Sequence, residues 1–587
     1  MKSNNTMRVA AMLVLALILA APLAGLAQDE NAGHNHGPLT APAKNPLSEN
    51  NREILSRMSM QDFRGRMKPI DTYVRELSMK VTKRENFEEW EPTDLYISWV
   101  TNSHYWFEYP VLAVRFQGVK DLLGVSQETK WVSLASLITP DGQYKLNDQV
   151  REALRTPDRD RSKVQRKLLK FDERAQIFNN ALNGGGVRLF PIPGDKNNTW
   201  VELDGIEQLE NAEVAQAYSK AADDFLQGFN AADNARVFTG LDALRGFQQQ
   251  YGAAVLPSDF SVNSELWLNR AHPFRNVTMG YLAAFVVLMV AFFWNLGRLK
   301  GVPYSFKHPI YLLGSLVFWA SIAYHLYAYV LRWIASGRAP LSNGYESLIF
   351  ISLATAIAGL IFELNDRKGS SGGVSALLTM VILAVAMLST FDPAIGPLVP
   401  VLASYWLNIH VTIITGSYGF LGLGSMLGAL TLILMLFKGP DRDHIRTAVL
   451  SLDRLHFKVL VTGLGLLSVG TLLGGVWANE SWGRYWGWDS KETWSLVTIL
   501  VYATAIHFRW IPMLNRPWVL AASGFAGIAS VVMTYFGVNY FLSGLHSYAA
   551  GDPMKVPDWV FIGAGLMGAL ILSSFLSDRF RSWDRPS

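Results

Sequence analysis

The chain has 587 residues, of which 50% are hydrophobic and only 17% are charged, and its formal net charge is +4. This near-neutral balance excludes the strongly basic character of a nucleic-acid-binding protein, so no nucleic-acid partner is expected. The chain contains no cysteine, which excludes disulfides, thiolate metal sites and thiol exchange within the chain itself. Any reaction that needs thiols must take them from a substrate or a partner.

The N-terminal region carries an export signal. Residues 1–27 combine basic residues with a long apolar run that ends in small residues. This pattern predicts a secretory signal peptide or an uncleaved N-terminal anchor, and in either case export of the residues after it. Residues 28–50 are polar and rich in proline, and we expect them to form a linker.

Residues 51–270 are expected to form an exported soluble domain that is α-rich or α+β. Long stretches mix charged and apolar residues at helical spacing, as in the segment that starts at Asp148. Short β-prone segments, such as YPVLAVRF from Tyr109, favour a small sheet. The segment GRMKPIDTYVREL, residues 65–77, has no evident chemistry, so a packing or docking role is its simplest interpretation.

From residue 278 onward the chain consists of apolar segments long enough to cross a bilayer. The fold expected for residues 278–577 is a polytopic α-helical membrane protein with about nine spans. The seventh span is short and is expected to begin inside the loop before it. The expected spans are residues 278–296, 309–331, 345–363, 374–390, 409–437, 459–478, 494–508, 517–541 and 558–577.

Basic residues indicate the orientation of these spans. Export of the preceding domain places alternate connections on the cytoplasmic side, and each of these connections contains lysine or arginine, for example Arg298, Arg367 and Arg446. This distribution agrees with the positive-inside rule. The expected location is therefore the bacterial inner (cytoplasmic) membrane, with the soluble domain and the connection after the sixth span on the outer, periplasmic side.

That outer connection has the sequence VWANESWGRYWGWDSKETWSL, residues 476–496. Tryptophan is enriched at bilayer interfaces, so one or two of them would indicate membrane anchoring. Five in one short loop, interleaved with glycine and with charges of both signs, favour a shelf for a flat, amphipathic ligand such as a porphyrin. The residues concerned are Trp477, Trp482, Trp486, Trp488, Trp494, Arg484, Asp489, Lys491 and Glu492.

The segment WGRYWGWDSKETWSL resembles the WWD signature of the haem-handling proteins of cytochrome c biogenesis. Its ending, WDSKETW, is most similar to the CcsA branch, which is part of the System II cytochrome c synthetase. The resemblance covers roughly residues 309–577 and is strongest at SNGYES, the WWD loop and GLHSYA. It implies a WWD loop at residues 477–494 that covers a substrate haem b. The haem-contacting residues would be Trp482, Trp486, Trp488, Asp489, Trp494, Arg484 and Lys491.

Two histidines flank this loop on the outer side, His410 at the start of one span and His546 just past the end of another. Neutral imidazole is a common axial ligand of haem iron, although a lone histidine at a helix end is more often an interfacial hydrogen-bonding residue. Two at one depth beside an aromatic shelf favour ligation, and the resemblance implies that this pair is the external ligand set. Arg332 and Arg338, in an outer loop, have two equally weighted interpretations: contact with haem propionates or ordinary loop charge.

His507 lies near the cytoplasmic end of the span after the loop. An ionisable residue within a span is by default a functional hypothesis, and the resemblance implies that His507 binds haem iron at a second, inner position. The partner ligand is expected from a separate CcsB (ResB-like) protein, with His325 as the less favoured internal substitute. His308, His444 and His456 are expected to be solvated on cytoplasmic loops.

Together these features predict a haem-delivery and cytochrome c synthetase subunit. His410 and His546 are the expected catalytic residues, because they would hold haem while the thiols of an apocytochrome CXXCH segment add to its vinyl groups. The expected partners are a CcsB/ResB-like membrane protein, apocytochrome c and thiol-reducing proteins of the outer compartment. Two other classes of function stay open: a haem exporter that attaches nothing, and a non-catalytic membrane scaffold.

Overall fold

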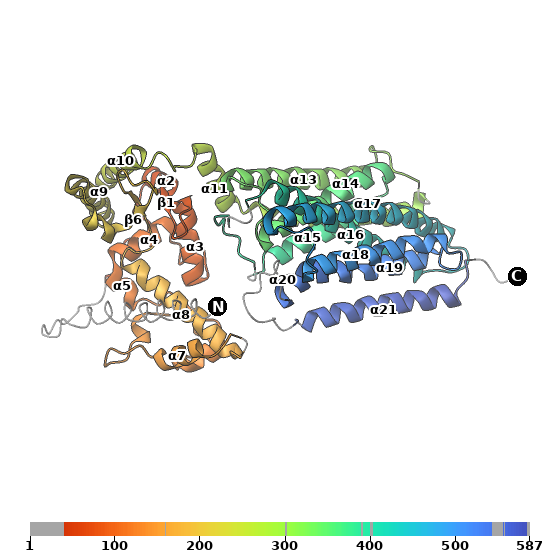
Figure 1. The fold of residues 1–587 in the computed structure, drawn as a ribbon, viewed down its shortest axis with the longest axis horizontal. Coiled ribbons are helices and arrows are strands. Elements are labelled where there is room, and N and C mark those ends of the chain that lie inside the picture. The colour runs from red at the N-terminus through yellow and green to blue at the C-terminus, as the bar shows by residue number, and fades with distance from the viewer. Residues whose placement is uncertain are drawn as a thin grey trace. The chain divides into compact units, whose positions relative to one another are not determined.

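The structure, a computed structural model, describes residues 40–158, 160–299, 302–388, 391–398, 403–542, 556 and 558–583. The chain divides into two compact units, residues 1–258 and 259–587 (Figure 1). The expected signal peptide or anchor at residues 1–27 lies outside the described residues, and the expected linker is described only from residue 40. Helix α11 (Asp259–Ala271), within the range expected for the exported domain, groups with the second unit.

The first unit is helical, and its described strands form three two-stranded antiparallel sheets, β1–β2, β3–β4 and β5–β6. Its helices are α2 (Glu49–Arg57), α3 (Ile70–Thr82), α4 (Pro92–Thr101), α5 (Ser103–Glu108), α6 (Gln117–Leu123), α7 (Asn147–Arg155), α8 (Lys163–Leu182), α9 (Ala212–Asn230) and α10 (Asn234–Tyr251). Its strands are β1 (Ser59–Gln61), β2 (Met67–Pro69), β3 (Leu112–Ala113), β4 (Trp131–Val132), β5 (Phe190–Pro191) and β6 (Trp200–Val201).

Aromatic side chains and ion pairs join the elements of this unit. Trp99 of α4 packs edge-on against Phe178 of α8, with ring centroids 4.9 Å apart. Within the segment 65–77, which forms β2 and the start of α3, the Lys68 ammonium lies 2.7 Å from the Glu76 carboxylate. This pair ties the hairpin to the helix, which supports a packing role for the segment.

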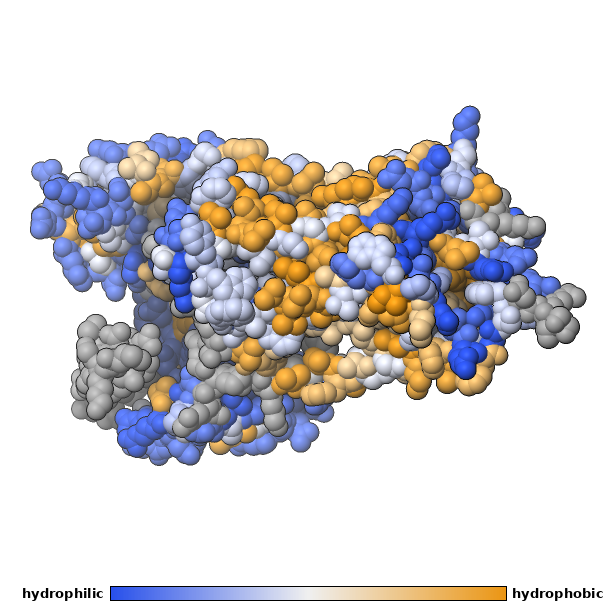
Figure 2. Space-filling view, turned by 45° about the vertical axis from the view of Figure 1, so that its right-hand side comes forward, coloured by the Kyte–Doolittle hydropathy of each residue, from blue (hydrophilic) through white to orange (hydrophobic). Residues whose placement is uncertain are grey.

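The second unit is a helical bundle, and the polytopic α-helical fold is confirmed. Seven helical segments of the described residues are long and apolar enough to cross a membrane, and α15 is a shorter apolar helix. Hydrophobic side chains cover the flank of the bundle, as a lipid-facing surface requires (Figure 2). Besides α11, its helices are α12 (Pro273–Trp294), α13 (Pro309–Ser336), α14 (Gly344–Asp366), α15 (Ser370–Ala386), α16 (Tyr405–Met435), α17 (Asp443–Trp482), α18 (Ser490–His507), α19 (Pro517–Val532), α20 (Val538–Phe541) and α21 (Asp558–Phe580).

Helix α17 is much longer than the span expected at residues 459–478. It has 40 residues, or about 60 Å at ~1.5 Å per residue, roughly twice the hydrocarbon thickness of a bilayer. His456 lies within it and is 1% exposed, so the expectation that His456 is solvated on a loop is wrong. Its ring lies against Gly428 of α16 and Gly524 of α19, two positions where a larger residue would meet the imidazole.

Candidate functional site

The tryptophan-rich loop connects α17 to α18, and the capping interactions of the two helices fix its ends. Helix α17 ends at Gly483, whose φ of +71° is the left-handed conformation that favours glycine. Helix α18 begins with a capping box, in which the Asp489 carboxylate accepts from the Glu492 N–H at 2.8 Å and Glu492 accepts from the Asp489 N–H at 3.3 Å. Glu492 also accepts from the Gly487 N–H at 2.7 Å. Asp489 therefore serves as a helix cap, and its predicted contact with haem stays a prediction.

The expectation that all five tryptophans lie in one loop is wrong: Trp477 and Trp482 belong to the end of α17, Trp494 belongs to α18, and the connection itself holds Trp486 and Trp488. Four of the five form two edge-on pairs. The ring centroids of Trp477 and Trp482 are 4.7 Å apart, and those of Trp486 and Trp488 are 5.7 Å apart. Trp488 and Tyr485 are 69% and 65% exposed. The buried indole N–H of Trp486 has no hydrogen-bond partner among the described residues. A hydrogen-bond donor without a partner, next to exposed aromatic rings, is suited to binding a flat ligand that carries acidic groups.

His410 lies near the start of α16, against α17. Its Nδ1 atom is 2.7 Å from the carbonyl oxygen of Gly470. Because a carbonyl oxygen only accepts, Nδ1 carries the proton and Nε2 carries the lone pair. Donation from one ring nitrogen to a backbone carbonyl is typical of metal-ligating histidines, since it fixes the tautomer and the orientation of the ring.

His507, the last residue of α18, has the same tautomer. Its Nδ1 atom is 2.7 Å from the carbonyl oxygen of Ala503, one helical turn earlier, so Nε2 again carries the lone pair. The side chain is exposed, and its ring packs edge-on against Trp510 at 4.4 Å. Helix α18 has 18 residues, which places His507 about 26 Å from the loop along the helix.

The other two predicted iron ligands are placed differently. His325 is fully buried in α13, where its Nδ1 lies 3.2 Å from the Tyr281 hydroxyl and its ring packs edge-on against Tyr281 and Phe274. These neighbours differ from those of His507, and the described residues do not bring the two histidines together. His546 lies outside the described residues, and the outer histidine pair stays a prediction.

The two basic residues predicted to lie near haem have different surroundings. Arg484 is exposed, and its guanidinium group lies directly against Gly487, where an added Cβ atom would overlap its present position. Lys491 instead contacts the π-helical turn Met533–Gly537 and helix α20: its Nζ donates to Asn539 Oδ1 at 2.8 Å and lies 5.8 Å from the centroid of the Tyr535 ring. Arg484 is thus available to an anionic ligand, whereas the contacts of Lys491 are internal.

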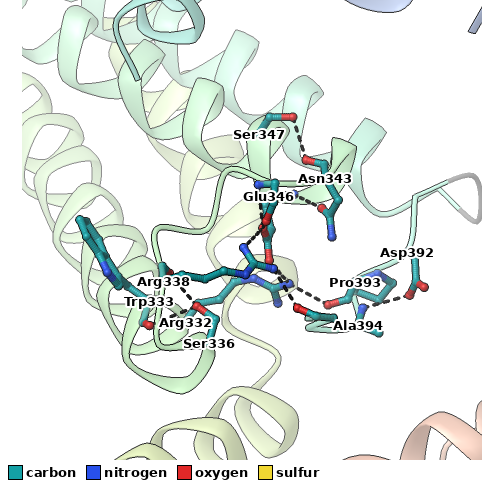
Figure 3. A network of polar contacts seen from close by, with 12 residues as sticks. Arg332, Trp333, Ser336, Arg338, Asn343, Glu346, Ser347, Asp392, Pro393 and Ala394 are labelled. Carbon is teal, nitrogen blue, oxygen red and sulfur yellow. Dashed lines mark hydrogen bonds and ion pairs between the residues drawn. The ribbon is translucent and has the colours of Figure 1, made fainter. Parts of the chain in front are cut away.

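The buried Arg332 and the half-buried Arg338 form an ion cluster with the buried Glu346 (Figure 3). The Glu346 carboxylate accepts from Arg332 at 3.1 Å and from Arg338 at 3.0 Å. The same guanidinium groups donate to the carbonyl oxygens of Pro393 and Gly396 at 2.9 and 3.1 Å. The cluster therefore ties α13, α14 and the loop 391–398 together. Sequence reasoning missed Glu346, although a carboxylate at the start of an apolar span was the available signal.

The chain is similar to proteins of cytochrome c assembly. Residues 341–546 match the family model described as Cytochrome C assembly protein. Protein NrfI of Wolinella succinogenes is 35% identical over 86% of this chain and 55% of NrfI. The match is longer than the second unit, so it extends into the first. Cytochrome c biogenesis protein CcsA of Guillardia theta is 36% identical over 37% of this chain and 79% of its own length, and that of Porphyra purpurea is 33% identical over 43% and 98%.

Proposed function

Because the chain belongs to the CcsA-type cytochrome c assembly family, we propose that it binds haem on the outer face of the bacterial inner membrane and presents it to apocytochrome c. The substrate is haem b, held by His410 and His546 while the thiols of a CXXCH segment add to its vinyl groups. The observation that carries this proposal is the hydrogen bond from His410 Nδ1 to Gly470, because it leaves the lone pair on Nε2.

The chain's own residues bind and orient the haem. The exposed rings of Trp488 and Tyr485 offer a surface for the porphyrin face, with Trp482 and Trp494 as further haem contacts. The Trp486 N–H and the Arg484 guanidinium are donors suited to propionates. The haem supplies the vinyl groups and the redox chemistry. No cysteine of this chain competes with the substrate thiols.

We assign His507 to an inner haem position on the route across the membrane. Its exposed ring supports a partner ligand from a CcsB/ResB-like membrane protein, because a second chain can approach an exposed imidazole. His325 is the less favoured substitute, since it is buried among aromatic rings. Thiol-reducing proteins of the outer compartment would keep the apocytochrome cysteines reduced. This assignment depends on an orientation with the tryptophan-rich loop outside.

The visible absorption spectrum of the detergent-purified protein, co-expressed with a ResB-like partner under haem-sufficient conditions, tests the proposal. We expect sharp low-spin bands in the parent and their loss or alteration in His410→Ala and His546→Ala. His444→Ala, in the first turn of α17, is the matched control and is expected to keep the parent spectrum. A parent protein without haem absorption would contradict the proposal, and the loop would then be interpreted as a membrane anchor.

The alternative is a haem exporter that does not attach haem to a cytochrome. The position of His507, at the end of α18 far from the loop, favours movement of haem across the membrane. Export and attachment would use the same outer histidines, so the spectrum alone does not separate them. Co-expression with an apocytochrome does. Covalent haem on the cytochrome, dependent on His410, supports attachment, whereas free outer haem without covalent product supports export alone.

A further inference from the structure

We propose that Tyr535 is a positioning residue for the outer haem site and fixes the base of the tryptophan-rich loop against helix α14. This inference rests on the proposed function and deepens it by naming what holds the loop in place. Tyr535 lies in the π-helical turn Met533–Gly537, between α19 and α20. Such turns interrupt an α-helix at an energetic cost and are frequent at functional sites.

The hydroxyl group of Tyr535 reaches the first turn of α14. It lies 2.6 Å from Ser347 Oγ and 3.2 Å from the carbonyl oxygen of Gly344, and the Tyr535 side chain is buried. The same turn contains Glu346, which the buried arginine cluster holds (Figure 3). Tyr535 is therefore bonded to the part of α14 that several buried charges fix.

The π-helical turn also contacts α18. Thr534 Oγ1 lies 3.1 Å from the carbonyl oxygen of Trp494. The Lys491 ammonium group lies over the ring of Tyr535, a cation–π arrangement, and donates to Asn539 one turn further on. The residues of this turn thus hold the beginning of α18 at two points, and both points belong to the WDSKETW segment.

A continuous set of contacts therefore runs from the SNGYES segment through Tyr535 to the tryptophan-rich loop. Removing the Tyr535 hydroxyl would break the link to α14, while the ring under Lys491 and the capping box of α18 would remain. We expect the loop to keep its fold and to lose its exact placement. A small displacement of residues that bind a ligand is enough to weaken binding and alter the properties of the bound group.

Tyr535→Phe compared with Tyr418→Phe tests this inference. Tyr418 packs edge-on against Tyr535 at 6.2 Å and is buried, and its hydroxyl makes no hydrogen bond to the described residues. Both variants thus remove one buried hydroxyl. The measurements are haem transfer from the detergent-purified protein to excess apomyoglobin and the reduction potential of the bound haem. We expect Tyr535→Phe to bind haem about fivefold more weakly, the effect of one buried hydrogen bond, and to shift the potential, whereas Tyr418→Phe matches the parent.

Ser347→Ala removes the other partner of the same hydrogen bond. If the bond positions the loop, Ser347→Ala changes haem binding and potential in the same direction as Tyr535→Phe but by less, because the Gly344 carbonyl oxygen still accepts from the Tyr535 hydroxyl. The double variant then matches Tyr535→Phe. Ser347→Ala also carries the test if Tyr535→Phe does not accumulate. Haem binding and potential equal to the parent in Tyr535→Phe, or in Ser347→Ala, overturn the inference and leave the proposed function intact. A parent that binds no haem overturns both.

Discussion

His410 and Gly470 are joined by a hydrogen bond of 2.7 Å between the imidazole Nδ1 and a backbone carbonyl oxygen of α17. A carbonyl oxygen has two lone pairs, so Gly470 can accept this bond in addition to its helical one. Small residues make the approach possible: a Cβ atom at Gly470 would lie 3.0 Å from the backbone nitrogen of Ile414, and one at Gly474 would lie 2.6 Å from His410 Cε1. The glycines of α17 therefore set both the helix spacing and the orientation of the ring.

Gly474→Ala is expected to displace the His410 ring and weaken or abolish the low-spin haem spectrum. The added methyl group has no space, because it would also lie 2.9 Å from Nδ1. Gly465→Ala, in the same helix, is the matched control, since nothing lies within 4 Å of its added Cβ. Both changes otherwise favour the helix by about 1 kcal/mol. Absorption per mole of purified protein is the measurement, and a Gly474→Ala spectrum equal to that of Gly465→Ala would contradict the prediction.

His507→Ala is expected to lower the total haem content, while the haem that remains keeps the low-spin bands that depend on His410. The reason is that His507 is assigned to an inner position and lies at the far end of α18 from the loop. Added imidazole should restore loading, because the ring of His507 is exposed and a free ligand can replace it. Haem content is measured after extraction, with His444→Ala as control. Unchanged loading in His507→Ala would refute the inner assignment.

The helical fold is predictable from the sequence because apolar length alone specifies a span. The ends are harder to predict. Helix α17 continues far beyond its apolar core because buried positions recur at helical spacing among charged residues, at Val449, Leu452, Leu455 and Val459. An average of hydropathy along the chain hides this pattern. For that reason the sequence predicts a loop position for His456, although the residue is buried within the helix.

The site is only partly predictable for a different reason. The composition of the tryptophan-rich loop indicates an aromatic shelf, but the roles of its charged residues depend on individual hydrogen bonds. Asp489 caps α18, and Lys491 bonds to Asn539, which lies 48 residues away in the chain. Glu346 likewise meets Arg332 and Arg338 only after α13 and α14 pack together. The spacing of residues in the local sequence does not show whether these charged side chains make internal contacts or face solvent.

Glu346→Gln is expected to destabilise the second unit strongly. It leaves the buried Arg332 and the half-buried Arg338 guanidinium groups without their carboxylate, and breaking a buried ion pair in this way costs about 3–5 kcal/mol. Thermal unfolding in detergent and the amount of folded protein measure the effect. Glu480→Gln is the control, because Glu480 is exposed and accepts from the Ser404 hydroxyl at 3.2 Å; its change should be within about 0.5 kcal/mol. Equal stability of the two variants would be inconsistent with a structural role for the cluster.

Lys83 gives the first unit a pH dependence of defined sign. Burial, together with Arg174 and other nearby cations, lowers the pKa of Lys83 from 10.5 to about 8. The unfolded chain therefore binds more protons than the folded unit between these values, and the free energy of unfolding from this group rises as the pH increases from 8 to 10.5. Below pH 8 the charged ammonium group opposes folding in full.

Lys83→Met should accordingly raise the unfolding midpoint at about pH 7, because the variant has no buried ammonium group to oppose folding. The increase in the free energy of unfolding that Lys83 contributes at alkaline pH should also be absent from the variant, because it has no ammonium group that loses its proton there. The measurement is chemical unfolding of the excised residues 40–258, whose hydrophobic core consists of its own side chains. Lys196→Met, an exposed lysine of the same unit, is the control and should leave both quantities unchanged. A midpoint for Lys83→Met at or below that of the parent at neutral pH would show that the ammonium group does not oppose folding.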